Sequence, residues 1–133
     1  MHFAVRHIAP GKPWAGDTGV EECCLVLLAG HCRITIDGRV ETLGPRPSVF
    51  AGYPHAIYLP PRTVFRVEAE GPTELADGRA PAFAKASAFA KATADKTAGK
   101  LGGTKREVRV IRPEDCGFEI RGGGNATRQI VDI

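Results

Sequence analysis

The stretch SVFAGYPHAIYLPPRTVFRVEAE, residues 48–70, predicts the fold. A Gly-Tyr-Pro break separates two apolar runs, Val49-Phe50 and Ala56-Ile57-Tyr58-Leu59. A double proline, Pro60-Pro61, follows, and residues 64–68 then alternate apolar and polar side chains. Short β-rich runs broken by glycine and proline at close spacing are typical of an all-β sandwich or barrel. We therefore expect an all-β fold.

The turn within this stretch resembles the second half of the motif pair of a cupin barrel. In that motif a Pro-Pro-Gly turn is followed three residues later by a metal-binding histidine. Here the turn is Pro60-Pro61-Arg62, and Phe65 occupies the place of the histidine. The resemblance implies a cupin-like (jelly-roll) β-barrel that lacks this metal ligand.

Further strands are expected on both sides of the stretch. The apolar run 21–28 favours a strand buried on both faces that ends at Ala29-Gly30. Residues 32–36 alternate as a half-buried strand does. Asp37-Gly38 is a strong two-residue hairpin signal. The other expected strands are an edge strand near Phe3 and Val5, a return strand at 39–43, and short strands at 73–76, 106–112, 117–120 and 129–133. Between them we expect a loop that carries Trp14 as a plug over the core, a rigid turn at 44–47 and a flexible connection at 121–125.

The segment 81–105 differs in character from the rest of the chain. It repeats the sequence AFAKA at residues 82–86 and 88–92, and alanine and lysine favour a short helix through 82–97. We interpret 81–105 as a low-complexity Ala/Lys-rich insertion in a surface loop, where long insertions cost little. Residues 1–80 and 106–133 then form one cupin-like domain. Its final apolar strand has no cap, so we expect the domain to be truncated at its C-terminal end.

Charge and hydropathy exclude several classes of protein. The chain of 133 residues has 43% hydrophobic and 25% charged residues, which is ordinary for one globular domain. Its net charge is +3, but five lysines and one aspartate give residues 81–105 a charge of +4, which leaves about −1 for the rest. A nucleic-acid-binding protein normally carries its basic face on the fold itself, so we expect no nucleic-acid partner. There is no apolar run long enough to span a membrane and no secretory signal, so we expect no membrane partner and a cytoplasmic protein.

No metal site is expected in this chain. In the cupin pattern a glutamate should stand seven residues before Gly30, where the sequence has Cys23. A His-x-His pair should lie within residues 14–19, which contain no histidine, and Phe65 replaces the last ligand. The four cysteines lack zinc spacing, so inert packing is favoured over a disulfide between Cys24 and Cys32. No cofactor is expected in this chain.

Few residues are candidates for a functional site, and no catalytic residue can be assigned. None of the four histidines pairs with another at ligand spacing, and His55, in a bend, is the one to mutate first. Arg121, Asn125 and Arg128 form a polar cluster beside a glycine run that could bind a sugar acid or a partner surface. The alternative for this cluster is a solvated loop, and for the histidines it is exposure or local hydrogen bonding.

Three blocks together resemble the N-terminal half of bacterial 5-deoxy-glucuronate isomerase, a family of myo-inositol catabolism. They are EECCLVLLAGHCRITIDG (21–38), LGPRPSVFAGYPHAIYLPPRTVFRVEAE (43–70) and VIRPEDCGFEIRGGGNATRQIVDI (110–133). The third block is the most distinctive, and the segment 81–105 has no counterpart in the family's pattern.

The resemblance implies a two-cupin enzyme that interconverts 5-deoxy-glucuronate and 5-dehydro-2-deoxy-gluconate. The divalent metal and its ligands would belong to a C-terminal cupin that this chain does not contain. The chain would then support a catalytic half, take part in homo-oligomer contacts and be inactive alone. Two alternatives remain: a metal-free cupin module for small-ligand binding or interaction, and a non-functional remnant that aggregates through its exposed final strand.

Overall fold

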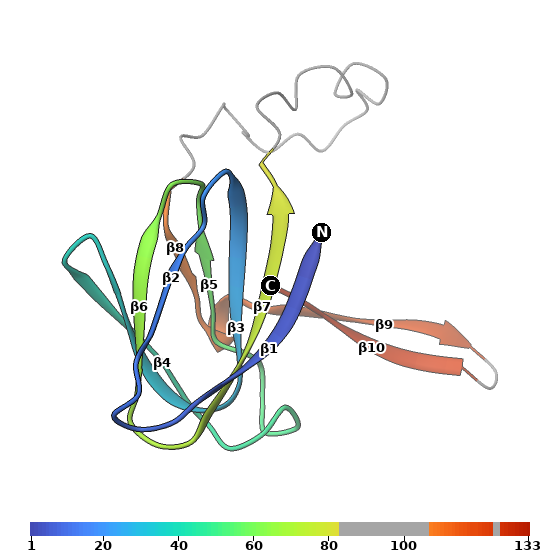
Figure 1. Cartoon of the computed structure of the whole chain (residues 1–133). Coiled ribbons are helices and arrows are strands. Elements are labelled where there is room, and N and C mark those ends of the chain that lie inside the picture. Colours follow the sequence, from blue (N-terminus) through green and yellow to red (C-terminus); the bar gives the residue numbers. More distant parts are fainter. Residues whose placement is uncertain (83–106, 124–125) are drawn as a thin grey trace, which may run out of the picture.

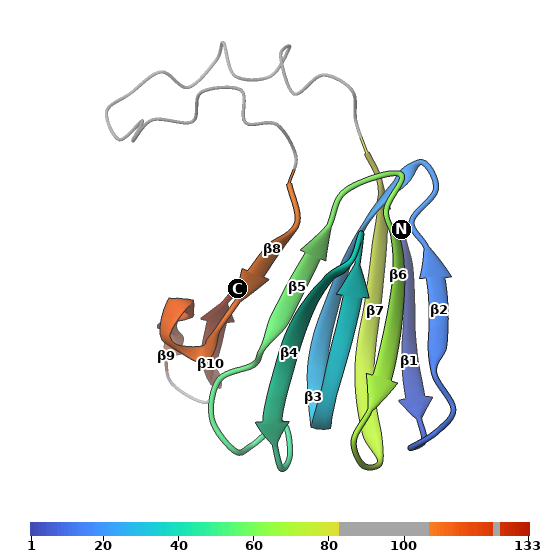
Figure 2. The same cartoon turned by 90° about the vertical axis from the view of Figure 1, so that its left-hand side faces the viewer.

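A computed structural model describes residues 1–82, 107–123 and 126–133 of the chain. Two antiparallel sheets face each other and share their longest strand (Figures 1 and 2). One sheet has the order β1-β7-β3-β5-β8, and the second half of β3 pairs with β4 and with β6, which also pairs with β2. The described strands are β1 (His2–Ile8), β2 (Trp14–Asp17), β3 (Glu21–Ile36), β4 (Arg39–Arg46), β5 (Ala56–Leu59), β6 (Val64–Ala69), β7 (Thr73–Pro81), β8 (Arg109–Ile111), β9 (Gly117–Gly123) and β10 (Ala126–Asp132). The fold is the predicted all-β, cupin-like one.

The core lies between the two sheets and is formed by alternate residues of the strands. In β6, for example, Phe65 and Val67 are buried whereas Val64 and Arg66 are exposed, as the alternation predicts. The buried core residues are Ile8, Cys23, Leu25, Leu27, Cys32, Ile34, Ile36, Leu43, Ile57, Leu59, Phe65, Val67 and Leu75.

Strand β3 corrects two expectations. It does not end at Ala29-Gly30 but continues to Ile36, and its first half alternates buried and half-buried residues instead of being buried on both faces. Its pairing shifts register against β7 between Leu27 and Ala29, so the strand moves from one sheet to the other. Gly30 makes this possible, because its φ is +102° and a Cβ there would lie 2.6 Å from the Thr73 hydroxyl.

The hairpin between β3 and β4 is confirmed. Asp37 and Gly38 have φ angles of 49° and 78°, and Ile36 pairs with Arg39. Positive φ at both positions is the geometry of a type I′ turn. The rigid turn expected at 44–47 is wrong, because β4 continues through Arg46.

Three more expectations differ from the structure. Trp14 begins strand β2 and does not lie in a loop. Strand β7 extends to Pro81, well beyond the short strand expected at 73–76. Residues 121–123, expected in a flexible connection, belong to β9 and pair with β10.

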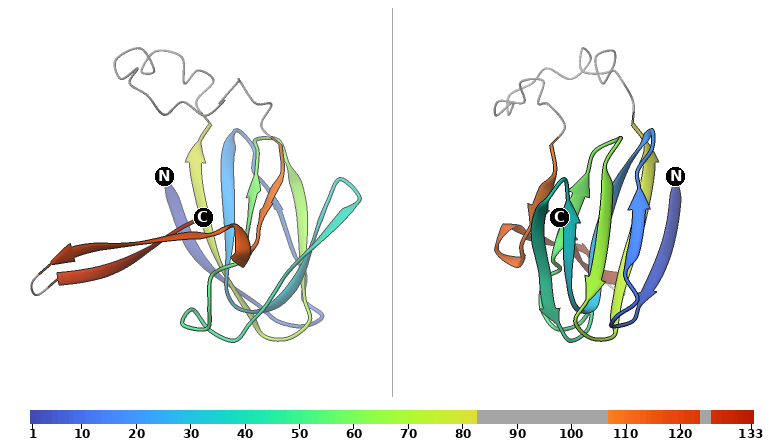
Figure 3. Two further views of the ribbon diagram at one scale, coloured as in Figure 1. Left: turned by 180° about the vertical axis from the view of Figure 1, so that it is seen from behind. Right: turned by 60° about the vertical axis from the view of Figure 1, so that its left-hand side comes forward.

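Strands β9 and β10 form a hairpin that is a sheet of its own. It follows β8 and a short 3₁₀ helix (Pro113–Asp115), and it projects from the rest of the molecule (Figures 1 and 3). We call this hairpin the arm. The side chains of its first strand are all exposed.

The predicted helix at 82–97 falls almost wholly on residues outside the described ranges, so it stays a prediction, and so does the domain division around 81–105. Among the described residues, no helix has the length and apolar character needed to cross a membrane.

Candidate functional site

The positions where a cupin carries its metal ligands are occupied here by packing residues. Phe65 is 1% exposed, and its ring stands edge-on to that of Trp14, with ring centroids 5.1 Å apart. A Cβ added at Gly16, which pairs with Phe65 across β2 and β6, would collide with the Phe65 ring. The space that a histidine and a metal would share is therefore filled by an aromatic pair.

Cys23, the third of these positions, belongs to a buried polar cluster. Its thiol lies 3.4 Å from Asp77 Oδ1. Asp77 is fully buried and accepts hydrogen bonds from Arg79 Nε at 2.9 Å and from Arg6 Nε and Nη2 at 3.1 and 2.9 Å. The Arg6 guanidinium also lies 4.9 Å from the centre of the Trp14 ring. Arg6 therefore connects the polar cluster around Asp77 to the aromatic pair of Trp14 and Phe65.

The protonation states of this cluster follow from its contacts. Burial alone would raise the pKa of Asp77, but the hydrogen bonds from Arg79 and Arg6 outweigh it and lower that pKa, so Asp77 is a carboxylate. Burial, together with the charge of Asp77, raises the pKa of Cys23 to about 12. Cys23 is therefore a neutral thiol at physiological pH and not an activated nucleophile.

These residues do not fit a divalent metal. The interior presents a thiol, two aromatic rings and one carboxylate whose oxygens are both engaged by arginines. Over the parts of the chain that the structure describes, no group of three or more His, Cys, Asp or Glu side chains could hold a metal ion. Asp77 and Arg6 instead link β7 to β1, and the Cys23 thiol adds a contact from β3.

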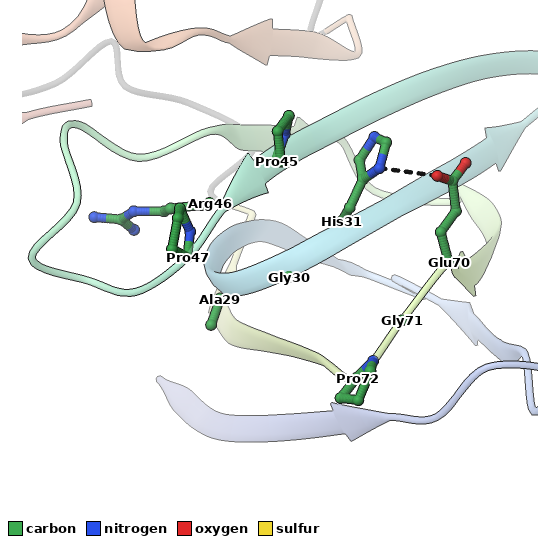
Figure 4. A pocket seen from close by; sticks show the side chains of 9 residues that line it. All are labelled: Ala29, Gly30, His31, Pro45, Arg46, Pro47, Glu70, Gly71 and Pro72. Atoms are coloured by element: carbon green, nitrogen blue, oxygen red, sulfur yellow. Dashed lines mark ion pairs between the residues drawn. The ribbon is translucent and has the colours of Figure 1, made fainter.

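A surface hollow of about 640 Å³ lies where β3 crosses between the sheets (Figure 4). His31 Nδ1 is 2.9 Å from Glu70 Oε2, and this pair stands on its rim. With Nδ1 turned towards Glu70, the neutral imidazole of His31 presents Nε2 as a hydrogen-bond acceptor. The lining residues are Ala29, Gly30, His31, Pro45, Arg46, Pro47, Glu70, Gly71 and Pro72.

The Arg46 side chain points away from His31 and Glu70 (Figure 4). Its guanidinium donates hydrogen bonds to the carbonyl oxygens of Leu27, Val49 and Gly52. It therefore fixes the loop that precedes β5, and it is not presented to a ligand.

Sequence reasoning missed the pair of His31 and Glu70. The two residues are far apart in the chain and meet because the end of β6 runs beside His31, where Glu70 N donates to the His31 carbonyl oxygen. No local pattern in the sequence signals this pairing.

The structure places Arg121 and Arg128 opposite each other on the arm, and it places His55 just before β5. His55 is half-buried just before β5, and its Nδ1 is buried without a hydrogen-bond partner. Burial and the nearby Arg112 lower its pKa, so it is neutral. Arg121 lies exposed on the arm, where it forms an ion pair with Glu119 at 2.8 Å, and it stands opposite Arg128 in the strand register. Asn125 lies outside the described residues.

This chain is similar in sequence and in structure to known proteins. The chain is 35% identical to proteins named 5-deoxy-glucuronate isomerase from Geobacillus kaustophilus (strain HTA426) and Geobacillus thermodenitrificans (strain NG80-2), in each case over 98% of this chain. The crystal structure of an IolB-like protein from Salmonella typhimurium LT2 matches with a TM-score of 0.74 and 29% identity over 96% of this chain.

The similarity covers only part of these relatives. The chain spans 41% of the length of both Geobacillus proteins and 41% of the Salmonella chain. The model of the KduI/IolB family nevertheless matches all of residues 1–133. The chain therefore belongs to the KduI/IolB family.

Proposed function

We propose that this chain is the part of a 5-deoxy-glucuronate isomerase that carries no metal site, and that it supports a catalytic part of the longer protein. The observation that carries this proposal is the 35% identity to proteins named 5-deoxy-glucuronate isomerase that are more than twice as long, within a family match over all 133 residues. The filled ligand positions around Phe65 and Cys23 support it, because they assign a structural role to this barrel interior.

The reaction explains why such a part would be inactive alone. Aldose–ketose isomerisation moves a proton between neighbouring carbons and needs a base and a group that polarises the carbonyl. A divalent metal bound elsewhere in the longer protein would supply the polarisation. The residues of this chain would hold that catalytic part in place. The whole protein would be a cytoplasmic enzyme of inositol catabolism, and its substrate would be a small sugar acid. Its subunits would be able to form a homo-oligomer.

An isomerase assay on the purified 133-residue chain tests this proposal. The Geobacillus kaustophilus relative is assayed beside it, and the metal content of both samples is determined. We expect turnover only from the relative. Turnover by the chain alone, together with a stoichiometric amount of metal in the sample, would contradict the proposal. It would mean that residues assigned here to packing form a metal site.

The hollow beside His31 favours a second function, small-ligand binding by a metal-free module. A proton acceptor next to a carboxylate suits the hydroxyl groups of a sugar acid. Calorimetric titration with glucuronate tests this function, with His31→Gln as the variant and His7→Gln, on an exposed pair with Glu74, as the control. Heat that is lost only in His31→Gln supports binding, and no heat in the unmodified chain rejects it.

On sequence grounds we further propose that residues 81–105 are an insertion in a domain formed by 1–80 and 106–133. Replacing the segment with a flexible Gly/Ser linker should leave the midpoint of urea unfolding unchanged. A large loss of stability would show that the segment is part of the domain.

A further inference from the structure

The arm carries an apolar side that is largely exposed in the described structure. Phe118 and Ile120 lie on the same side of β9 because side chains alternate along a strand, and they are 58% and 65% exposed. Glu119 and Arg121 occupy the other side and pair with each other. The arm is therefore amphipathic, although it projects away from the barrel that would bury an apolar side (Figure 3).

The loop before β5 extends this apolar side. The rings of Tyr53 and Phe118 lie 6.2 Å apart. Val131, which stands opposite Phe118 in the register, lines a hollow of about 370 Å³ together with Val49, Phe50, Gly52 and Tyr53. Phe50 is 95% exposed. We call the set Val49, Phe50, Tyr53, Phe118, Ile120 and Val131 the arm surface.

The arm surface has the composition of an interface core. Aromatic and aliphatic side chains without charged groups are enriched in the buried centre of interfaces, and aromatic residues carry much of the binding energy. A two-stranded hairpin is also only marginally stable in water by itself. Both considerations indicate a partner that covers the arm surface.

We propose that the arm surface docks against the part of the longer family members that this chain does not match. The proposal rests on the proposed function, because it takes the unmatched part to be the catalytic one. More than half of the length of each relative lies outside the match. A domain joined to this one in a single chain meets the arm at a high effective concentration, which favours it over a second copy that must arrive from solution.

A binding experiment tests the docking. The part of the Geobacillus kaustophilus relative outside the match is expressed separately, shown by circular dichroism to be folded, and titrated with the 133-residue chain in sedimentation velocity. We expect a complex that persists in 0.5 M NaCl, because an apolar contact is not screened by salt. The double variant Phe118→Ser/Ile120→Ser should weaken it at least tenfold.

The matched control is Val40→Ser/Val64→Ser, which replaces two exposed valines on β4 and β6. It should change the affinity less than twofold, and circular dichroism should show both variants folded, since the arm is a separate sheet. Absence of a complex, or equal affinity of the two variants, would overturn the docking. Self-association of the chain alone that only the arm variant abolishes would overturn it in favour of a second copy.

Isomerase activity measured in the same mixtures separates the two proposals. An arm-dependent complex without turnover supports the docking and contradicts the proposed function. Turnover that is equal in the arm variant and in the control contradicts the docking and leaves the proposed function in place.

Discussion

The ring of Phe65 stands edge-on to the ring of Trp14, with centroids 5.1 Å apart and planes at 82°. Phe65 stands where the cupin pattern places its last metal-binding histidine, and Trp14 lies within residues 14–19, where the pattern places a His-x-His pair. Aromatic rings prefer this edge-to-face arrangement, because the positive edge of one ring meets the negative face of the other. The contact is therefore a packing element at a position where the cupin pattern expects a metal ligand.

Phe65→Ala should destabilise the protein by about 3–5 kcal/mol, because it removes a fully buried ring and leaves a cavity. The neighbouring Val64, which is 60% exposed, offers a matched control, and Val64→Ala should cost less than about 1 kcal/mol. Urea unfolding followed by tryptophan fluorescence measures both changes. Similar costs for the two variants would contradict the packing role of Phe65.

The sequence predicts the structural features that depend on neighbouring residues, and it does not predict contacts between residues far apart in the chain. The type I′ turn at Asp37-Gly38 and the alternation around Phe65 were predictable, because both depend on neighbouring residues. The contact of Arg6 with Asp77 was not, because it joins residues 71 positions apart and depends on the register of β1 against β7. In β9, pairing with β10 outweighs the weak strand propensity of the glycines. Residues 121–123 therefore belong to the strand, although the sequence predicted that the flexible connection begins at residue 121.

Asp77→Asn should destabilise the protein by roughly 3–5 kcal/mol, because it leaves two arginines around an uncharged group in a buried site. The effect should depend on pH. The pKa of Asp77 is lower in the folded protein than the unfolded value of about 3.9, so its contribution is present above that pH and is lost as the pH falls through the lower folded value.

Urea unfolding at several pH values between 7 and 2 measures this effect. The unmodified protein should lose this contribution below about pH 4, and Asp77→Asn should lack that loss. Glu74→Gln, on the exposed pair with His7, is the control and should cost less than about 1 kcal/mol. A small cost for Asp77→Asn at pH 7 would mean that the cluster is not a stabilising element.

Cys23 and Cys32 should resist alkylation in the folded protein. Both are buried, and burial raises the pKa of each thiol to about 12. Because the folded values lie above that of an unfolded cysteine, the protein should lose stability as the pH rises from about 9 towards 12. Mass spectrometry after maleimide treatment at pH 8 should find both unmodified, whereas denatured protein is modified at all four cysteines. Fast labelling of Cys23 would contradict its assignment as an inert thiol.

His55 should titrate below the ordinary histidine value of about 6.5, because burial and Arg112 disfavour its charged form. A folded pKa below the unfolded one means that neutral His55 stabilises the fold above pH 6.5 and that this contribution is lost as the pH falls. Proton NMR of the imidazole signals measures the midpoint, and His55→Gln assigns the signal. A midpoint at or above 6.5 would place His55 in solvent and contradict its buried Nδ1.

Gly30→Ala tests how β3 passes from one sheet to the other. The φ of +102° disfavours any side chain, and the added Cβ would lie 2.6 Å from both the Pro72 carbonyl oxygen and the Thr73 hydroxyl. Gly38→Ala is the matched control, because its φ of +78° imposes a similar conformational strain while nothing lies within 4 Å of the new Cβ. The control should therefore cost only about 1–2 kcal/mol. Gly30→Ala should cost more than that in urea unfolding, since β7 must move away. Equal costs would show that strain at φ alone, and not the close approach of β7, requires glycine at position 30.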